Sequence, residues 1–347
     1  MMKKLLFLFL IILNTSSLFS CFDYTEVNSY YYASSLGLDY NSETCDYTVY
    51  IYIINTLNLS NIQTSSTEKD SIAYTAKYSE KSIPKALHNI FENSDIHIDL
   101  RHLRTLILKD TFINNDNLNV LTNLIKNDIN FYFNFAVYIT QDNLEDIYKV
   151  NNFTETSAYM TLLTMTNNYD NYHLAYFPNL VNDLSSENIS YNYPIIEHKK
   201  EILKKNDQEY ITIHLTGYGS LNELNEMVFV NDEDYHGIIY LNNRTNFQIT
   251  ITSYLITYNI INYKINYSIK NDEFYINIHL TGYNTTNSNK TTTYLEHELE
   301  SLLTELFIYT KNNNIDIFNI NHLAKLKNSK ISYKTVNLNF NFDIKIN

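Results

Sequence analysis

The sequence is poor in the residues that build several common functional sites. Among 347 residues it has no tryptophan, two cysteines, three prolines and five glycines. So little proline and glycine excludes a collagen-like chain or a flexible linker. The closest approach to a glycine-rich phosphate-binding loop is Gly217-Tyr218-Gly219, which lacks the third glycine that opens a helix. The two cysteines, Cys21 and Cys45, cannot form a zinc site, so the chain must rely on its hydrophobic core.

Positive charge is also scarce, because the formal net charge is −13. A surface of this sign repels the phosphates of nucleic acids and of anionic lipids, so we expect no nucleic-acid partner. Any attachment to a membrane would have to come from apolar insertion. No stretch after the first twenty residues reaches about 18 consecutive apolar residues, which excludes a second membrane span. Hydrophobic residues make up 44% of the chain, too many for a disordered protein.

The first twenty residues have the three parts of a secretory signal. Lys3 and Lys4 are followed by a short apolar run over 5–13 and a polar, small-residue tail over 14–20. The tail ends in Leu18-Phe19-Ser20-Cys21, which is similar to the bacterial lipobox. We therefore expect cleavage before Cys21, a thioether from its sulfur to diacylglycerol, and an acyl chain such as palmitate on its nitrogen. Two or more chains would make anchoring nearly permanent. The alternative is an ordinary cleaved signal with Cys21 merely nearby.

The pattern over residues 21–185 predicts an α/β module. Apolar strands at 46–55, 103–108 and 130–139 alternate with helical patterns at 83–91, 118–125 and 144–148. Ser82 and Asp142 are the predicted N-caps of two of these helices, and Pro84 fits a first helical turn. Residues 186–207 are polar, contain Pro194 and several lysines, and are predicted to connect two modules.

The pattern changes over residues 208–347 and predicts an α+β module. Strand-like segments follow one another without intervening helices, and the last of them alternates apolar and polar residues over 332–346. One long amphipathic helix carries an apolar stripe of Leu295, Leu299, Leu302, Leu303 and Leu306. We therefore expect a multi-domain protein with mixed β-sheets flanked by helices, α/β first and then α+β, in which the second sheet is antiparallel.

No group of residues predicts catalysis or a metal site. The basic segment Arg101-His102-Leu103-Arg104 could place His102 as a base or ligand, but no Ser-x-Gly elbow or carboxylate pair accompanies it. His297-Glu298 begins like a metalloprotease helix, yet Ser301 stands where the second histidine belongs. We interpret all of these as structural or surface residues. An enzymatic alternative centred on His102 would require a pocket with perturbed titratable groups.

The remaining candidates are also interpreted as structural. His214 and His279 occupy equivalent places in a repeated hexapeptide, Ile-His-Leu-Thr-Gly-Tyr, at 213–218 and 278–283. We expect both copies to be strands that end in glycine turns. Acidic and neutral neighbours disfavour a reactive thiolate at Cys45. The sequence therefore indicates no enzyme, no cofactor and no metal.

Over nearly its whole length the chain resembles the Ger(x)C spore germination lipoproteins. The motifs that carry the resemblance are Cys21-Phe22-Asp23-Tyr24-Thr25-Glu26-Val27-Asn28, Leu36-Gly37-Leu38-Asp39, a strand at 47–55, a helix at 81–91, His102-Leu103-Arg104-Thr105-Leu106-Ile107, Asp146-Ile147-Tyr148, a Glu-rich helix at 296–311 and Asp316-Ile317-Phe318. The chain departs from the family at Phe22, where tryptophan is usual, and lacks the C-terminal tryptophans and several turn glycines of the family.

The resemblance implies a non-enzymatic subunit of a nutrient germinant receptor. Such a subunit would be tethered through Cys21 to the outer surface of the spore inner membrane and would assemble with membrane A and B subunits. It identifies no germinant-binding residue. The alternative is a solute-binding lipoprotein on the outer face of the cell membrane, which would need two similar lobes around an aromatic cleft. The two halves of this sequence differ in pattern, which favours the first interpretation.

Overall fold

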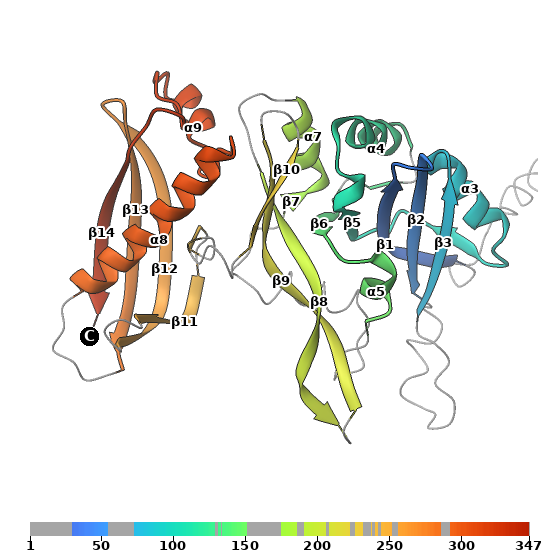
Figure 1. Ribbon diagram of the computed structural model, residues 1–347, viewed down its shortest axis with the longest axis horizontal. Coiled ribbons are helices and arrows are strands. Elements are labelled where there is room, and N and C mark those ends of the chain that lie inside the picture. Colours follow the sequence, from blue (N-terminus) through green and yellow to red (C-terminus); the bar gives the residue numbers. More distant parts are fainter. Residues whose placement is uncertain are drawn as a thin grey trace, which may run out of the picture.

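The computed structural model describes residues 30–54, 73–128, 131–132, 134–150, 175–185, 191–205, 208–222, 226–231, 237, 240–241, 244–251, 256–285 and 292–346. The signal, Cys21 and the motif over 21–28 lie outside these residues. The described chain forms two units, each built on a β-sheet that is covered by helices (Figure 1).

The first sheet is a mixed sheet of ten strands. Its order is β10-β9-β8-β6-β5-β1-β2-β3, with β4 beside β1 and β7 beside β6. The bounds are β1 (Tyr30–Asn41), β2 (Asp46–Ile54), β3 (Ala73–Glu80), β4 (His97–Asp99), β5 (Thr105–Lys109), β6 (Ala136–Thr140), β7 (Ala175–Tyr176), β8 (Asn192–Lys205), β9 (Gln208–Leu221) and β10 (Met227–Asn231). The central strands β1, β5 and β6 are parallel, whereas β2–β3 and β8–β10 are antiparallel ribbons at the two sides.

Both faces of the central strands are buried. One face packs against α3 (Ile83–Glu92), η3 (Asp110–Phe112), α4 (Asn115–Asn127) and α7 (Phe177–Ser185), and the other packs against α5 (Leu144–Tyr148). Leu106 and Leu108 belong to the first cluster and Ile107 to the second. Burial on both faces explains why the sequence of β5 is a continuous apolar run. The predicted α/β character of this unit is confirmed.

The helix starts agree only partly with the predicted caps. Ser82 is the N-cap of α3 in extended conformation, although its side chain makes no capping hydrogen bond, and Pro84 lies in the first turn. The predicted cap at Asp142 is wrong, because the N-cap of α5 is Asn143, whose side chain accepts from the backbone N–H of Glu145. Asp142 binds His198 on β8 instead.

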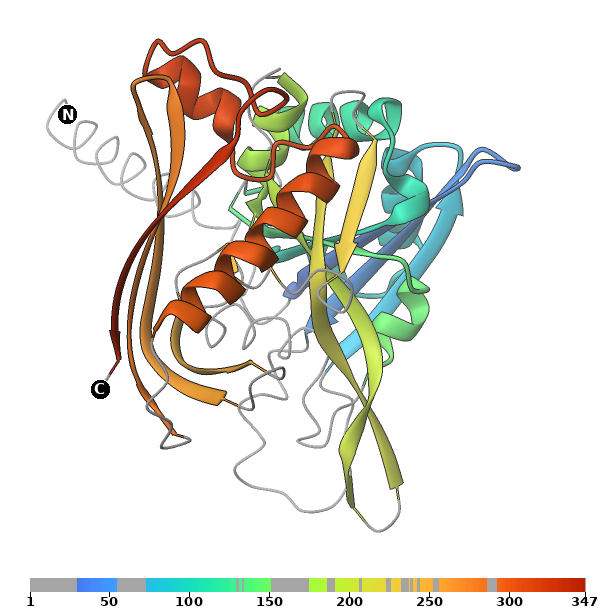
Figure 2. The same cartoon turned by 60° about the vertical axis from the view of Figure 1, so that its left-hand side comes forward.

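The structure differs from the expectation of a connection over 186–207. Residues 192–205 are strand β8, which pairs with β9 as a long antiparallel ribbon that projects beyond the neighbouring strands (Figures 1 and 2). A two-stranded ribbon is held by backbone hydrogen bonds and needs no buried face along its whole length. Its sequence can therefore be as polar as that of a loop, which is why the composition of this segment predicted a connection. The first unit therefore extends through β10.

The second sheet has four strands in the order β11-β12-β13-β14. The bounds are β11 (Arg244–Ile251), β12 (Ile256–Lys270), β13 (Glu273–Asn284), β14 (Leu338–Ile346), α8 (Thr293–Asn312) and α9 (Ile320–Leu326). Helix α8 lies across one face of this sheet, as Figure 2 shows. Its predicted stripe is confirmed, since Leu295, Leu299, Leu303 and Leu306 are all 0% exposed, while Leu302 at the margin of the stripe is half-buried against the same cluster.

The prediction of an antiparallel second sheet is wrong for its last strand. β14 pairs with β13 in parallel, from Phe274↔Leu338 to Gly282↔Ile346. The chain leaves β13, passes through α8 and α9, and returns in the same direction, which is the crossover that parallel pairing requires. The period-2 alternation predicted correctly which face of β14 is half-buried against the core, but it contains no information on strand direction.

The first hexapeptide lies within its strand, because β9 continues to Leu221, whereas the second lies at the end of β13, which stops at Asn284; in both copies the glycine is a paired strand residue and not part of a turn. Their glycines, Gly217 and Gly282, pair beside register shifts. A Cβ at Gly217 would lie 2.1 Å from the carbonyl oxygen of Val230, and one at Gly282 would lie 2.3 Å from that of Asn259. Glycine at both positions therefore permits a close approach of neighbouring backbones.

The two units share an interface. Tyr218 on β9 and Val230 on β10 are buried in the hydrophobic cluster of the second unit. The hydroxyl of Tyr309 on α8 donates a hydrogen bond of 3.4 Å to the carbonyl oxygen of Phe229 on β10. The β9–β10 ribbon thus contributes to both cores.

Candidate functional site

The basic segment Arg101-His102-Leu103-Arg104, in which His102 was a candidate base or ligand, forms a turn between β4 and β5. The Asp99 carboxylate, 5% exposed, accepts from the backbone N–H of Arg101 at 2.8 Å and from its guanidinium at 2.5 to 3.0 Å. Burial is the largest single effect on the pKa of Asp99 and acts to raise it, but the hydrogen bonds and charge of Arg101 together hold that pKa below its ordinary value. This pair anchors the turn.

His102 and Arg104 of the basic turn are exposed beside the start of β1. The ring of His102 meets the ring of Tyr32 edge-on, with centroids 4.5 Å apart. Arg104 is exposed, and its backbone N–H donates to the carbonyl oxygen of Ser34 at 3.0 Å. His102 lines neither the pocket along α8 nor the pocket between β3 and α3.

The other predicted histidines lie on separate elements. His214 is exposed on β9 of the first sheet. His279 is on β13, where its Nδ1 lies 3.2 Å from Asp343 Oδ2 on β14, and both side chains are 52% exposed. The structure therefore does not bring His102, His214 and His279 together.

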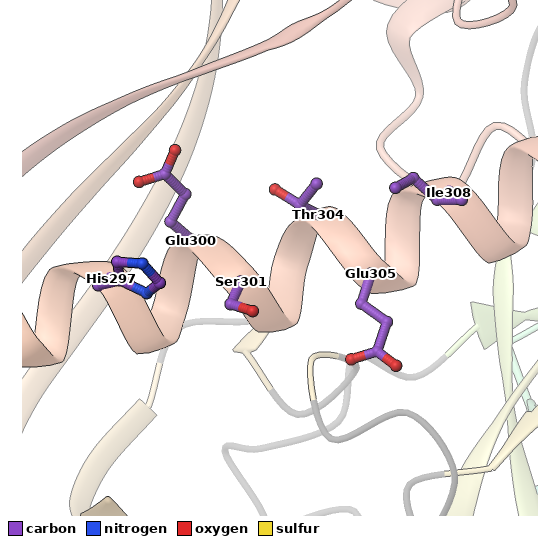
Figure 3. A pocket seen from close by; sticks show the side chains of 6 residues that line it. All are labelled: His297, Glu300, Ser301, Thr304, Glu305 and Ile308. Atoms are coloured by element: carbon purple, nitrogen blue, oxygen red, sulfur yellow. The ribbon is translucent and has the colours of Figure 1, made fainter.

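The pocket along the exposed face of α8 has a volume of about 500 Å³ (Figure 3). Its described lining residues are His297, Glu300, Ser301, Thr304, Glu305 and Ile308. Figure 3 shows the carboxylates of Glu300 and Glu305 pointing in opposite directions. They cannot converge on one ion, and no group of three potential metal ligands occurs in the described part of the chain.

The pocket between β3 and α3, of about 520 Å³, was not predicted from the sequence. Tyr74 and Tyr78 of β3 are 42% and 38% exposed, and the rings of Tyr31 and Tyr74 stand 6.4 Å apart. Asn89 and Asn93 line the opposite side. The alternation Tyr74, Ala76, Tyr78 could have revealed this strand. The abundance of tyrosine in the whole sequence, 32 residues, conceals it.

Asp183, on helix α7 beside the first sheet, carries a buried carboxyl group. Asp183 of α7 accepts hydrogen bonds from the Tyr193 hydroxyl at 2.5 Å and from the backbone N–H of Tyr191 at 3.1 Å. Burial raises the pKa of Asp183 to about 7, although both hydrogen bonds act to lower it. Both donors are neutral, so the group joins α7 to β8 without a compensating positive charge.

Cys45 is an exposed thiol in the turn between β1 and β2. Its backbone has φ of 53°, in the left-handed region. Its Sγ donates a weak hydrogen bond of 3.7 Å to the carbonyl oxygen of Ser42. Cys21, the predicted lipidation site, lies outside the described residues.

Comparison with known proteins identifies the first unit. The family model described as "Spore germination protein N-terminal domain" matches residues 23–197, half of the chain. The protein belongs to the Ger(x)C family of spore germination proteins. The matched segment runs from before β1 into β8, so it includes the basic turn, the β3–α3 pocket and the Asp183 site of this Ger(x)C protein.

One solved structure, described as the crystal structure of the GerBC protein, is similar at 14% sequence identity and a TM-score of 0.47. The alignment covers 90% of this Ger(x)C chain and 96% of that one. No curated protein matches the sequence significantly. Among the described residues, no helix combines the length and the apolar character needed to cross a bilayer.

Proposed function

We propose that this protein is the lipid-anchored C subunit of a nutrient germinant receptor. It is a non-enzymatic subunit, held by Cys21 at the outer surface of the spore inner membrane beside membrane A and B subunits, and it is needed for nutrient-triggered germination. The observation that carries the proposal is the family match over residues 23–197, which begins two residues after the predicted lipidation site.

The position of the first strand supports a tether close to a membrane. β1 begins at Tyr30, nine residues after Cys21. Nine residues span at most about 30 Å when fully extended. An acylated Cys21 would therefore keep the first unit next to the bilayer, where membrane subunits are within reach.

The scatter of candidate catalytic groups supports a non-enzymatic role. Of the predicted histidines, His102 lies in the turn before β5, His214 on β9 and His279 on β13. Asp183, whose pKa burial raises to about 7, has tyrosine partners and hydrogen-bonds to none of these histidines. Binding and scaffolding are the roles that such a distribution suits.

The architecture favours this proposal over a solute-binding lipoprotein. That alternative predicts two similar lobes with a ligand cleft between them. Here the first unit has a ten-stranded mixed sheet and the second a four-stranded sheet under one long helix. The aromatic pocket lies inside the first unit, between β3 and α3.

The test is genetic, in sporulating cells of the source organism. Gene deletion and Cys21→Ala should both abolish or strongly delay germination by nutrients, while revival by pressure or lysozyme persists. Cys45→Ala is the matched control and should germinate normally, because Cys45 is an exposed turn residue. A normal nutrient response in both the deletion and the Cys21→Ala strain would overturn the proposal. Impaired solute uptake in vegetative cells with normal germination would support the solute-binding alternative.

A further inference from the structure

The parallel strands of the first sheet all begin at one edge, which we call the amino-terminal edge. Ser35 of β1 pairs with Thr105 of β5, and Thr105 pairs with Ala136 of β6. The segment that leads back to Cys21 joins the sheet at this edge, because β1 begins there. The tether therefore leaves the body at a defined place.

The amino-terminal edge carries exposed tyrosines. Tyr132, 61% exposed, precedes β6, and Tyr176, 39% exposed, pairs with Ala136 at its first residue. Tyr74, 42% exposed, pairs with Ile53, which pairs with Ala33 near the start of β1. A tyrosine side chain has an apolar ring and a polar tip, and such residues concentrate where a bilayer meets water.

The same edge carries two of the three arginines in the sequence, Arg101 and Arg104, with His102 between them. All three are exposed. Asp95, Asp99, Asp128, Glu92 and Glu226 also lie near this edge, together with the exposed Lys126, so the edge carries a small net negative charge in a chain whose net charge is −13. A guanidinium group suits bidentate contact with a phosphate, so the exposed Arg104 offers a favourable contact with lipid that offsets part of this negative charge.

We propose that the amino-terminal edge rests on the bilayer surface, with the tyrosines at headgroup level and Arg104 contacting lipid phosphates. This inference rests on the proposed anchoring through Cys21. The tether alone limits only the distance to the membrane, whereas this contact would also fix the orientation of the first unit. The opposite end of the sheet, with the turn between β1 and β2, would then face away from the lipid.

The absence of tryptophan allows a direct test. Tyr132→Trp gives the full chain a single indole reporter at the edge, and Ser42→Trp, at an exposed residue of the turn between β1 and β2 at the opposite end of the sheet, is the matched control. Each variant is purified with its native anchor and reconstituted in phosphatidylglycerol-containing vesicles, with or without bromine on the acyl chains near the headgroup. Bromine should reduce the indole emission of the Tyr132→Trp variant by about twofold or more and leave that of the Ser42→Trp variant unchanged.

A second set of variants tests the contact of Arg104. Arg104→Gln in the Tyr132→Trp background should reduce the quenching, because each basic residue near an anionic surface strengthens binding about fivefold. Raising the salt concentration should have a similar effect. Lys330→Gln, at an exposed residue of the second unit, should have none.

The design separates this inference from the proposed function. A parallel sample carries a hexahistidine segment in place of Cys21 and is tethered to nickel-chelating lipids, so orientation is tested whether or not the native chain is acylated. Equal emission of the Tyr132→Trp variant with and without bromine, in tethered chains that float with the vesicles, would overturn the inference, and a partner protein would then be the occupant of this edge. A native chain that fails to float contradicts only the anchoring.

Discussion

At the scale of single residues, three aspartates show how local partners set the behaviour of a buried carboxyl group. Asp99 is paired with Arg101, and its pKa stays below the ordinary value despite burial. Asp316 accepts from the backbone N–H groups of Ile320 and Asn321 at the start of α9, and burial raises its pKa to about 6. Asp183, with a tyrosine hydroxyl and one N–H, has a pKa of about 7. The charge and hydrogen bonds of Arg101 outweigh the effect of burial on the pKa of Asp99, whereas at the more deeply enclosed Asp183 and Asp316 the neutral donors do not.

The raised pKa of Asp183 predicts a pH-dependent stability. In the unfolded chain its pKa is 3.8, so the folded state holds an extra proton between about pH 4 and pH 7. Its contribution to the free energy of unfolding is therefore greatest below the unfolded pKa and declines as pH rises to about 7. Urea unfolding of the wild type and of Asp183→Asn at pH 4, 5.5, 7 and 8 measures this contribution, because other groups cancel in the difference.

The variant should lose that part of the decline in stability between pH 4 and pH 7. Above pH 8 the difference between the two proteins should no longer change with pH. Parallel stability curves across the whole range would contradict the assignment of a raised pKa to Asp183.

At the scale of elements, two of the motifs that resemble the Ger(x)C family prove to be one contact. Gly37 of β1 lies against Tyr148 of α5, where a Cβ on Gly37 would stand 2.8 Å from both the ring and the hydroxyl of Tyr148. The Tyr148 hydroxyl lies 2.9 Å from Ser35 Oγ, and its ring stacks with those of Tyr50 and Tyr52. Glycine in the Leu-Gly-Leu-Asp motif thus creates space for the tyrosine that follows Asp146-Ile147.

Gly37→Ala should therefore destabilise the protein. The added methyl group must displace a buried aromatic ring, and overpacking of this kind costs about 1–3 kcal/mol. Urea unfolding measures the loss, and Ser79→Ala, at an exposed residue of β3, provides a control that should change stability little. If Gly37→Ala were as stable as the wild type, the contact would not explain the motif.

Elements with strong periodicity could be predicted, and those set by distant partners could not. The Leu stripe of α8 and the alternation of β13 and β14 identified their buried faces, because burial leaves a period of 3.6 or 2 in the sequence. Strand direction in β14 and the strand state of 192–205 depend on what lies beside them in space. Asp142 was assigned to the wrong role for the same reason, since its partner His198 is 56 residues away.

Candidate surfaces were predicted less well than the fold. The basic turn at 101–104 was evident because arginine is rare in this sequence. The β3–α3 pocket was missed, because each of its tyrosines was individually uninformative and the groove forms only when α3 packs beside β3. Asp183 gave no signal, since a lone aspartate in a helix is usually exposed.

At the scale of the whole molecule, the two units are joined through the β9–β10 ribbon, and the tether enters at the amino-terminal edge of the first sheet. A membrane subunit complex would thus meet a body whose first unit is held within about 30 Å of the lipid. The net charge of −13 opposes adsorption of the body as a whole, so the proposed attachment to the membrane would depend on the lipid at Cys21.

The central claim is that Cys21 carries this lipid in the spore membrane, and mass spectrometry of the mature amino terminus tests it most directly. The account predicts that the protein is recovered from the spore inner-membrane fraction and that its first residue is Cys21, with diacylglycerol on sulfur and an acyl chain on nitrogen. An unmodified terminus, in a protein that remains in the soluble fraction, would contradict it.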